Sequence, residues 1–316
     1  MSAQDQTGEG DRDAMAPIDT LEIIDAQIHE PFPAVRLNGA DMHLLTRMQI
    51  ELAREAMDAI GVDRALAVTD DAFIELASTL FPGRFPGVHT FFPIVDDFGP
   101  AVRKVAANPA MVAGRALVGN FATAEMRPEF DTGKFDTLYA AAEEVGLPIF
   151  NSTHGGCARM AEIAERHPTL TLIIDHIGVA QHPVSPPETM SWATFPDLLD
   201  LARYSNIAVK LCGAPLLSEE SYPFEDLWPR LDQLIAAFGA ERIMWASDYT
   251  RLRTADLPRG ARPRRRGLTY AESLNFLLRS DRLSLADKRL IFGGTATRLL
   301  RLPPIGTDWP VPEMRW

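Results

Sequence analysis

Short apolar runs alternate along the chain with longer stretches of helical periodicity. The runs are rich in Val, Ile and Leu and cover residues 21–29, 64–70, 88–95, 111–120, 147–153, 170–178, 207–213 and 242–248. Between them lie segments such as 42–61 and 135–146, in which apolar residues recur every three or four positions before a glycine. Strands that are apolar on both faces and alternate with amphipathic helices predict a parallel sheet covered by helices.

Eight such units in 316 residues predict a closed (β/α)8 TIM barrel. An open doubly wound sheet is the competing architecture. The sequence shows no internal repeat and no Gly/Ser-rich boundary, so residues 19–316 are expected to form a single barrel domain with a C-terminal helix and extension. Residues 1–18 are polar and are predicted to be a disordered tail.

The composition limits the partners. A net charge of −12 and a pI near 5.1 disfavour a general nucleic-acid or membrane-surface binder. We therefore expect a small-molecule substrate, no nucleic acid and no membrane. Two cysteines and no apolar leader segment predict a reducing, cytoplasmic setting. The closing segment DWPVPEMRW, with two tryptophans, suggests a homo-oligomer contact.

Polar residues occupy the ends of several predicted strands, where the catalytic groups of a barrel lie. Gln27 and His29 end the first and, being two apart, point to the same side. His154 follows the fifth, His176 ends the sixth and Asp248 ends the eighth. Taken singly, each has a structural explanation, such as a hydrogen-bonded histidine or a loop anchor. Together, three imidazoles and a carboxylate make a donor set that suits zinc.

The remaining histidines act as a control, since none of them ends a predicted strand: His43, His89, His167 and His182.

Three basic residues are candidates for binding a carboxylated substrate. Arg115 on the fourth strand and Lys210 on the seventh can pair with carboxylates, although an internal ion pair with a rim acid is the alternative. Arg251 begins an arginine-rich loop directly after Asp248, where it can guide an anionic substrate. Asp175, beside His176, is expected to face the opposite way and brace a neighbouring loop.

Successive blocks of the chain resemble a known family. They read DAQIHE, NSTHGG, PTLTLIIDHIG, NIAVKLCG, FGAERIMWASDY and LIFGGTATRLLRLP, and together they span about residues 21–303. Their order and spacing are similar to those of the amidohydrolase-related barrels, the branch that holds sugar-acid and pyrone dicarboxylate lactonases and metal-dependent decarboxylases. The resemblance implies a (β/α)8 barrel and usually one divalent ion. The ligand positions carried over are Gln27, His29, His154 and Asp248.

The chain departs from that pattern at Gln27, where the family commonly has histidine. An amide is a weak, neutral oxygen ligand that zinc uses less readily than harder ions do. Either His29, His154 and Asp248 still hold an ion, expected to be zinc or manganese, with Gln27 giving its carbonyl or orienting a water, or the site works without metal. We expect Asp248 to transfer the proton in both cases, with His29, His154 and His176 as its catalytic partners.

The sequence thus predicts a hydrolase that opens a lactone or similar ester or amide bond in a small carboxylated molecule. A metal-dependent non-oxidative decarboxylase on the same rim is the first alternative. A barrel that binds a ligand without turnover is the second.

Overall fold

The structure is a computed structural model of the chain. It describes residues 18–31, 41–118, 130–153, 155–180, 192–250, 268–306 and 309. Residues 1–17, which hold most of the predicted tail, fall outside these ranges, and so do His154, His182 and Arg251.

Eight parallel strands form one sheet in the order β1 to β8. The strands are β1 Ile24–Ile28, β2 Arg64–Ala67, β3 Gly87–Phe91, β4 Met111–Ala116, β5 Ile149–Asn151, β6 Leu172–Ile174, β7 Ile207–Lys210 and β8 Ile243–Met244. Two backbone hydrogen bonds join the last strand region to the first, from Ala26 N to Trp245 O (3.0 Å) and from Asp248 N to Gln27 O (3.0 Å). The sheet therefore curves into a (β/α)8 barrel, as predicted, and is not an open doubly wound sheet.

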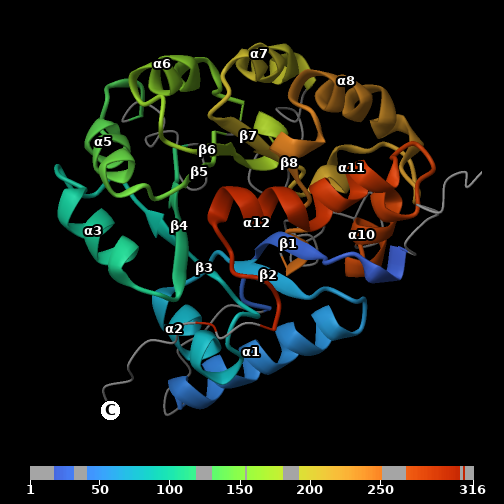
Figure 1. The fold of residues 1–316 in the computed structure, drawn as a ribbon, viewed down its shortest axis with the longest axis horizontal. Coiled ribbons are helices and arrows are strands. Elements are labelled where there is room, and N and C mark those ends of the chain that lie inside the picture. Colours follow the sequence, from blue (N-terminus) through green and yellow to red (C-terminus); the bar gives the residue numbers. More distant parts are fainter. Residues whose placement is uncertain are drawn as a thin grey trace, which may run out of the picture.

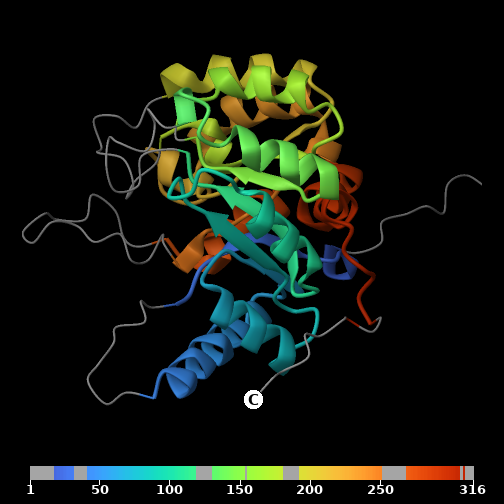
Figure 2. The same ribbon diagram turned by 90° about the vertical axis from the view of Figure 1, so that its left-hand side faces the viewer.

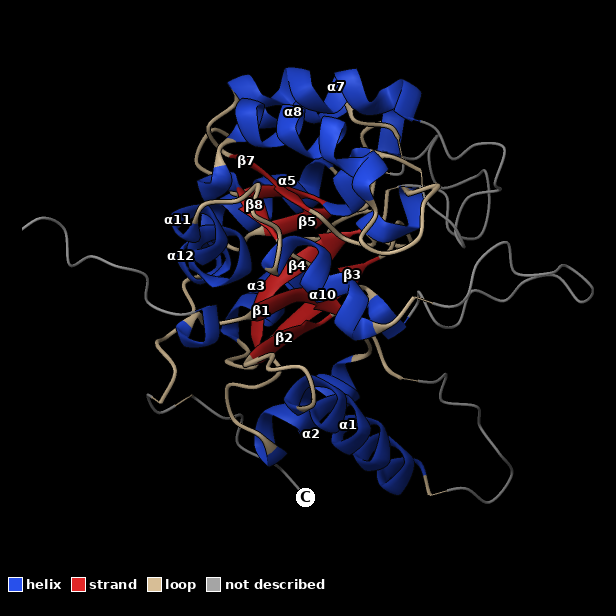
Figure 3. Cartoon of the chain, turned by 90° about the vertical axis from the view of Figure 1, so that its right-hand side faces the viewer, coloured by secondary structure: helices blue, strands red, loops and turns tan. Residues whose placement is uncertain are grey.

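Helices surround the strands (Figures 1 and 3). They are α1 Met42–Asp58, α2 Asp71–Leu80, α3 Gly99–Ala107, α5 Asp136–Val145, α6 Ala158–Arg166, α7 Phe195–Asp200, α8 Trp228–Phe238, α10 Tyr270–Leu278, α11 Leu285–Arg289 and α12 Thr295–Leu300. Figure 2 shows α1 and α2 side by side at one end of the molecule. Among the helices in the described ranges, none is both long and apolar enough to cross a membrane.

One cluster of buried apolar side chains fills the barrel interior, because every strand contributes to it. Its members include Ile24, Ala26, Leu66, Val88, Ala113, Phe150, Ile173, Ala208 and Met244. Ala296 and Leu300 of α12 belong to the same cluster, so this helix packs against the interior at one end. A second, larger cluster includes residues of the helices and the outward-facing strand residues.

The strands are shorter than the sequence predicts. β3 ends at Phe91, so residues 92–95 are not strand, and β8 contains only Ile243 and Met244. The helices agree more closely, since α1 ends at Asp58 and α5 ends one residue before Gly146, which has a φ of 67°. After β8 the run continues past the hydrogen-bonded ladder into buried residues, Trp245 and Ala246, whereas after β3 the apolar residues Phe92, Ile94 and Val95 are exposed and belong to no strand.

Candidate active site

The inward rows of the barrel end in polar residues. Along a strand, every second side chain shares a face, and the row that begins with Ala208 continues to Lys210. Likewise Ala113 leads to Arg115, and Ile173 leads to Asp175. All three polar residues are buried, so they lie beneath the mouth of the barrel rather than on its surface.

A register shift in β1 places Gln27 and His29 in the same interior. The pairing with β2 is irregular between Asp25 and Ile28, and Ile28 packs in the outer cluster although Ile24 and Ala26 pack in the inner one. An irregularity of this kind changes which face the following side chains occupy. Gln27 and His29 thereby come within 3.4 Å of each other, measured between Gln27 Nε2 and His29 Nε2.

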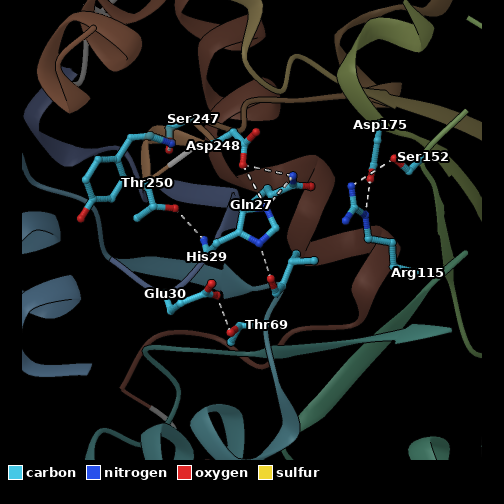
Figure 4. A network of polar contacts seen from close by, with 12 residues as sticks. Gln27, His29, Glu30, Thr69, Arg115, Ser152, Asp175, Ser247, Asp248 and Thr250 are labelled. Atoms are coloured by element: carbon cyan, nitrogen blue, oxygen red, sulfur yellow. Dashed lines mark hydrogen bonds and ion pairs between the residues drawn. The ribbon is translucent and has the colours of Figure 1, made fainter. Parts of the chain in front are cut away.

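His29 directs one ring nitrogen at Asp248. Its Nδ1 lies 2.5 Å from the carbonyl oxygen of Val68, so Nδ1 carries a hydrogen and donates it. Its Nε2 lies 3.1 Å from Oδ1 of Asp248 (Figure 4). An unprotonated nitrogen and a carboxylate oxygen are both acceptors, so a proton on Nε2 or a metal ion bound by both atoms is needed at this contact. A ligating histidine commonly donates its other N–H to a backbone carbonyl in this way, and the pair therefore fits a divalent ion.

Lys210 determines the orientation of the Gln27 amide. Nζ of Lys210 donates to Oε1 of Gln27 at 2.6 Å, and Nε2 of Gln27 donates to Oδ1 of Asp248 at 3.3 Å. Lysine has only donors and a carboxylate only acceptors, so the reverse orientation of the amide would lose both hydrogen bonds. The expectation that Gln27 offers its carbonyl to an ion is therefore wrong for this arrangement, because the NH2 group faces the site.

Asp175 binds two buried cations. Its Oδ2 lies 2.7 Å from Nε of Arg115, and its Oδ1 lies 2.9 Å from Nζ of Lys210. Burial alone would raise the pKa of Asp175, but the charges of Lys210 and Arg115 outweigh burial and hold this pKa well below its usual range. The internal ion pair that we considered as the alternative for Arg115 and Lys210 is present. We had expected Asp175 to brace a neighbouring loop, and this expectation is wrong, because both of its oxygens pair with buried cations. Substrate binding by Arg115 and Lys210 stays a prediction.

Asp248 is an anion at neutral pH. Burial would raise its pKa, but the hydrogen bond and charge of His29 and the charge of His176 hold the pKa at about 2. Burial lowers the pKa of His176. His176 and Asp248 both have left-handed backbones, with φ of 55° and 54°. Such conformations are costly outside glycine and are often found at functional sites.

A third residue, which sequence reasoning missed, joins these two. Ligand atoms of His176, Cys212 and Asp248 all lie within 4.8 Å of one another, and all three residues are buried. Cys212 belongs to the inner cluster and follows Lys210 by two positions. That spacing was the available signal, but a cysteine in an apolar run is usually read as core. His, Cys and Asp side chains together make a donor set that fits a divalent ion.

Asp25 forms hydrogen bonds with Ser247, the residue before Asp248, and with the backbone of Gln27. Its Oδ1 accepts from the backbone N–H of Ser247 (2.8 Å) and of Gln27 (3.1 Å), and its Oδ2 accepts from Oγ of Ser247 (2.5 Å). Burial raises the pKa of Asp25 to about 6, against the lowering effect of these hydrogen bonds. Asp25 thus joins the residue before Asp248 to β1. His154 and Arg251 lie outside the described residues, and their roles stay predictions.

Comparisons with known proteins show which proteins this chain resembles. A curated 4-sulfomuconolactone hydrolase of Hydrogenophaga intermedia is 29% identical over 123 residues, which is 38% of this chain and 38% of that protein. Among solved structures, an amidohydrolase from Burkholderia multivorans with bound zinc has a TM-score of 0.68 at 18% identity, over 89% of this chain and 100% of the other. A 5-carboxyvanillate decarboxylase from Sphingomonas paucimobilis has a TM-score of 0.57 at 18% identity, over 90% and 100%.

At these identities the two structures support the fold alone, and the curated relative is matched over well under half of its length. The amidohydrolase family model is more extensive, since it matches residues 24–302. This range has nearly the limits of the resemblance noted in the sequence, and the expectation of a hydrolytic enzyme agrees with it. The chain belongs to the amidohydrolase family.

Proposed function

We propose that this protein is a hydrolase that opens a lactone, or a comparable ester-like bond, in a small carboxylate-bearing molecule. The observation that carries the proposal is the contact between His29 and Asp248, where an anionic carboxylate and an oriented imidazole meet at 3.1 Å at the end of the barrel. The partial match to a lactone hydrolase supports the choice of bond.

In this proposal Asp248 accepts the proton of the attacking water. It is ionised at neutral pH, so it can act as a base and not as an acid. The Gln27 N–H donates to Oδ1 of Asp248 and keeps that oxygen in place. The carbonyl oxygen of Val68 fixes the His29 ring through Nδ1, so that Nε2 stays directed at Oδ1 of Asp248. The carboxylate can then return the proton to the alkoxide that leaves when the ring opens.

His29 and Asp248 would hold a divalent ion if one is bound, with His154 as a further expected ligand. Such an ion lowers the pKa of a bound water and polarises the substrate carbonyl. We expect zinc or manganese. Arg251 is the residue proposed to attract the substrate carboxylate, since Arg115 is already paired with Asp175.

Decarboxylation is the second candidate, because a decarboxylase shares this fold. It requires an acid that protonates the carbanion, and Asp248 is a carboxylate at neutral pH. The Gln27 NH2 group also takes the position of a ligand in the site. Both observations favour hydrolysis.

The test is turnover of a panel of carboxylated lactones, followed by mass spectrometry, before and after chelation. A product that has gained one water supports hydrolysis, whereas loss of carbon dioxide from aromatic or unsaturated acids supports the second candidate. Loss of activity on chelation, restored by zinc or manganese, would assign the metal-dependent version. Absence of turnover on every lactone, with carbon dioxide released from the acids, would overturn the proposal.

A further inference from the structure

We propose that Cys212 is a metal ligand, and that it binds a zinc-class ion together with His176 and Asp248. The three residues come from the ends of β7, β6 and β8, which are adjacent in the sheet. This inference concerns metal binding and does not depend on which bond the protein cleaves.

The positions of the three residues in the fold support a common centre. The backbone N–H of Leu211 donates to the carbonyl of Met244 at 2.9 Å, so β7 keeps its pairing with β8 up to the residue before Cys212. Cys212 packs in the inner cluster with Ala208, and hence its side chain lies on the inner side of the barrel. Asp248 has the same inward position beyond β8.

The distances suit one ion. The ligand atoms of the three side chains lie within 4.8 Å of one another. Bonds of about 2.0–2.3 Å to a tetrahedral zinc require ligand atoms to be about 3.5 Å apart. Small side-chain rotations can make up the difference, and His29 Nε2, 3.1 Å from Asp248 Oδ1, is already at such a spacing.

The orientation of Gln27 explains why a ligand is needed on this side of the site. Its carbonyl oxygen accepts from Lys210 and its NH2 group faces Asp248, so the first strand offers one imidazole, His29, and no oxygen ligand from position 27. A thiol at the end of β7 supplies the missing donor from the opposite side of Asp248. His176, which the sequence analysis names as a catalytic partner of Asp248, is thereby assigned to the ion.

A thiolate ligand also selects the metal. Sulfur ligands favour zinc over manganese and magnesium, which prefer oxygen. Cys212 therefore narrows the expected ion from zinc or manganese to zinc, and predicts that cobalt, a common spectroscopic substitute for zinc, is bound with the same ligands.

The experiment is cobalt titration of the full-length protein after removal of metal by chelation. The chain has two cysteines, so a near-ultraviolet sulfur-to-cobalt charge-transfer band must come from Cys212 or Cys157. We expect the band in the unsubstituted protein and in Cys157→Ser, and its loss in Cys212→Ser. Cys157 is a matched control because it is also buried, with its Sγ 3.4 Å from Oγ1 of Thr153.

Competition between zinc and manganese gives a second readout. Cys212→Ser is expected to weaken zinc binding by roughly tenfold or more and to leave manganese binding nearly unchanged. Cobalt binding without the band, or a band that persists in Cys212→Ser, would overturn the inference. So would absence of metal binding.

The substituted proteins can be compared with the unsubstituted protein only if they fold, which circular dichroism establishes. X-ray absorption of the unsubstituted zinc-loaded protein avoids that requirement. Sulfur in the zinc coordination shell supports the proposal, and a shell of nitrogen and oxygen alone contradicts it.

Discussion

Nζ of Lys210 lies 2.6 Å from Oε1 of Gln27, although 183 residues separate the two in the chain. Lys210 also binds Asp175, so it couples the amide that faces Asp248 to a buried ion-pair network. An uncharged side chain that contacts the proposed base is thus oriented by a cation on β7, which β8 separates from β1 in the closed barrel. The consequences can be measured by substitution.

Replacing Gln27 by Glu should move the acidic limb of the pH–rate profile to higher pH. The new carboxylate can keep the contact with Lys210, but its second oxygen would replace the amide nitrogen that lies 3.3 Å from Oδ1 of Asp248. Two carboxylates this close do not both ionise readily, so the pair should bind a proton at higher pH than Asp248 does alone. We expect the apparent pKa of kcat/KM to rise by about one unit or more.

Gln27→Met is the control for that experiment. It removes the same hydrogen bonds without adding charge, so activity should fall while the position of the acidic limb stays the same. An unshifted limb in Gln27→Glu would show that residue 27 does not interact with the proton-transfer group.

Replacing Asp248 by Asn should lower kcat/KM by roughly 100- to 10,000-fold while the protein stays folded, because the amide cannot accept the proton of water. The measurement is steady-state kinetics on any lactone that the protein turns over. Asp232→Asn on α8, where the carboxylate is largely exposed, should retain nearly full activity. Comparable activities in the two variants would remove Asp248 from the mechanism.

Replacing Asp175 by Asn should destabilise the fold by roughly 3–5 kcal/mol, because Arg115 and Lys210 would remain buried without their counter-charge. Urea unfolding followed by circular dichroism measures the change. Glu51→Gln, which breaks the exposed pair with Arg47 on α1, should cost less than about 1 kcal/mol. Equal costs would mean that the buried network contributes no more than a surface pair.

Asp25 should make the protein less stable as the pH rises from about 4 to about 6. Its pKa is about 6 in the folded protein and 3.8 as a model value, so in this range the folded state holds a proton that the unfolded state has lost. The stabilisation that Asp25 contributes is therefore fully present below its pKa in the unfolded chain, and it is lost as the pH rises through its pKa in the folded protein. Two pKa units correspond to about 3 kcal/mol.

Asp25→Asn removes that titration while its amide can still accept from the backbone N–H groups of Ser247 and Gln27. The difference in unfolding free energy between the two proteins, measured across this pH range, should change in favour of the Asn variant as the pH rises. A constant difference would show that Asp25 titrates alike in the folded and unfolded states.

The polar ends of the predicted strands were recognisable because strand periodicity is local. Arg115, Lys210 and Asp248 were identified from the chain alone by their positions at the ends of predicted strands. A side chain two positions after an inward apolar residue also points inward, and this relation explains why the three point into the barrel. It failed to identify Cys212, since the same spacing is found for ordinary core cysteines. For β1 it showed that His29 and Gln27 share a face, but it could not show which face, because the irregular pairing in β1 is not visible in the sequence pattern.

The sequence by itself determined the alternation of buried strands and amphipathic helices, the barrel that follows from it, and the residue types at the strand ends. Only the tertiary structure decided the pairings: Asp175 with two cations, the Gln27 amide with its NH2 toward Asp248, and His176 close to Cys212. The physical reason is range. Apolar periodicity acts over a few neighbouring residues, whereas hydrogen bonds and buried charges depend on ångström-scale distances between segments far apart in the chain.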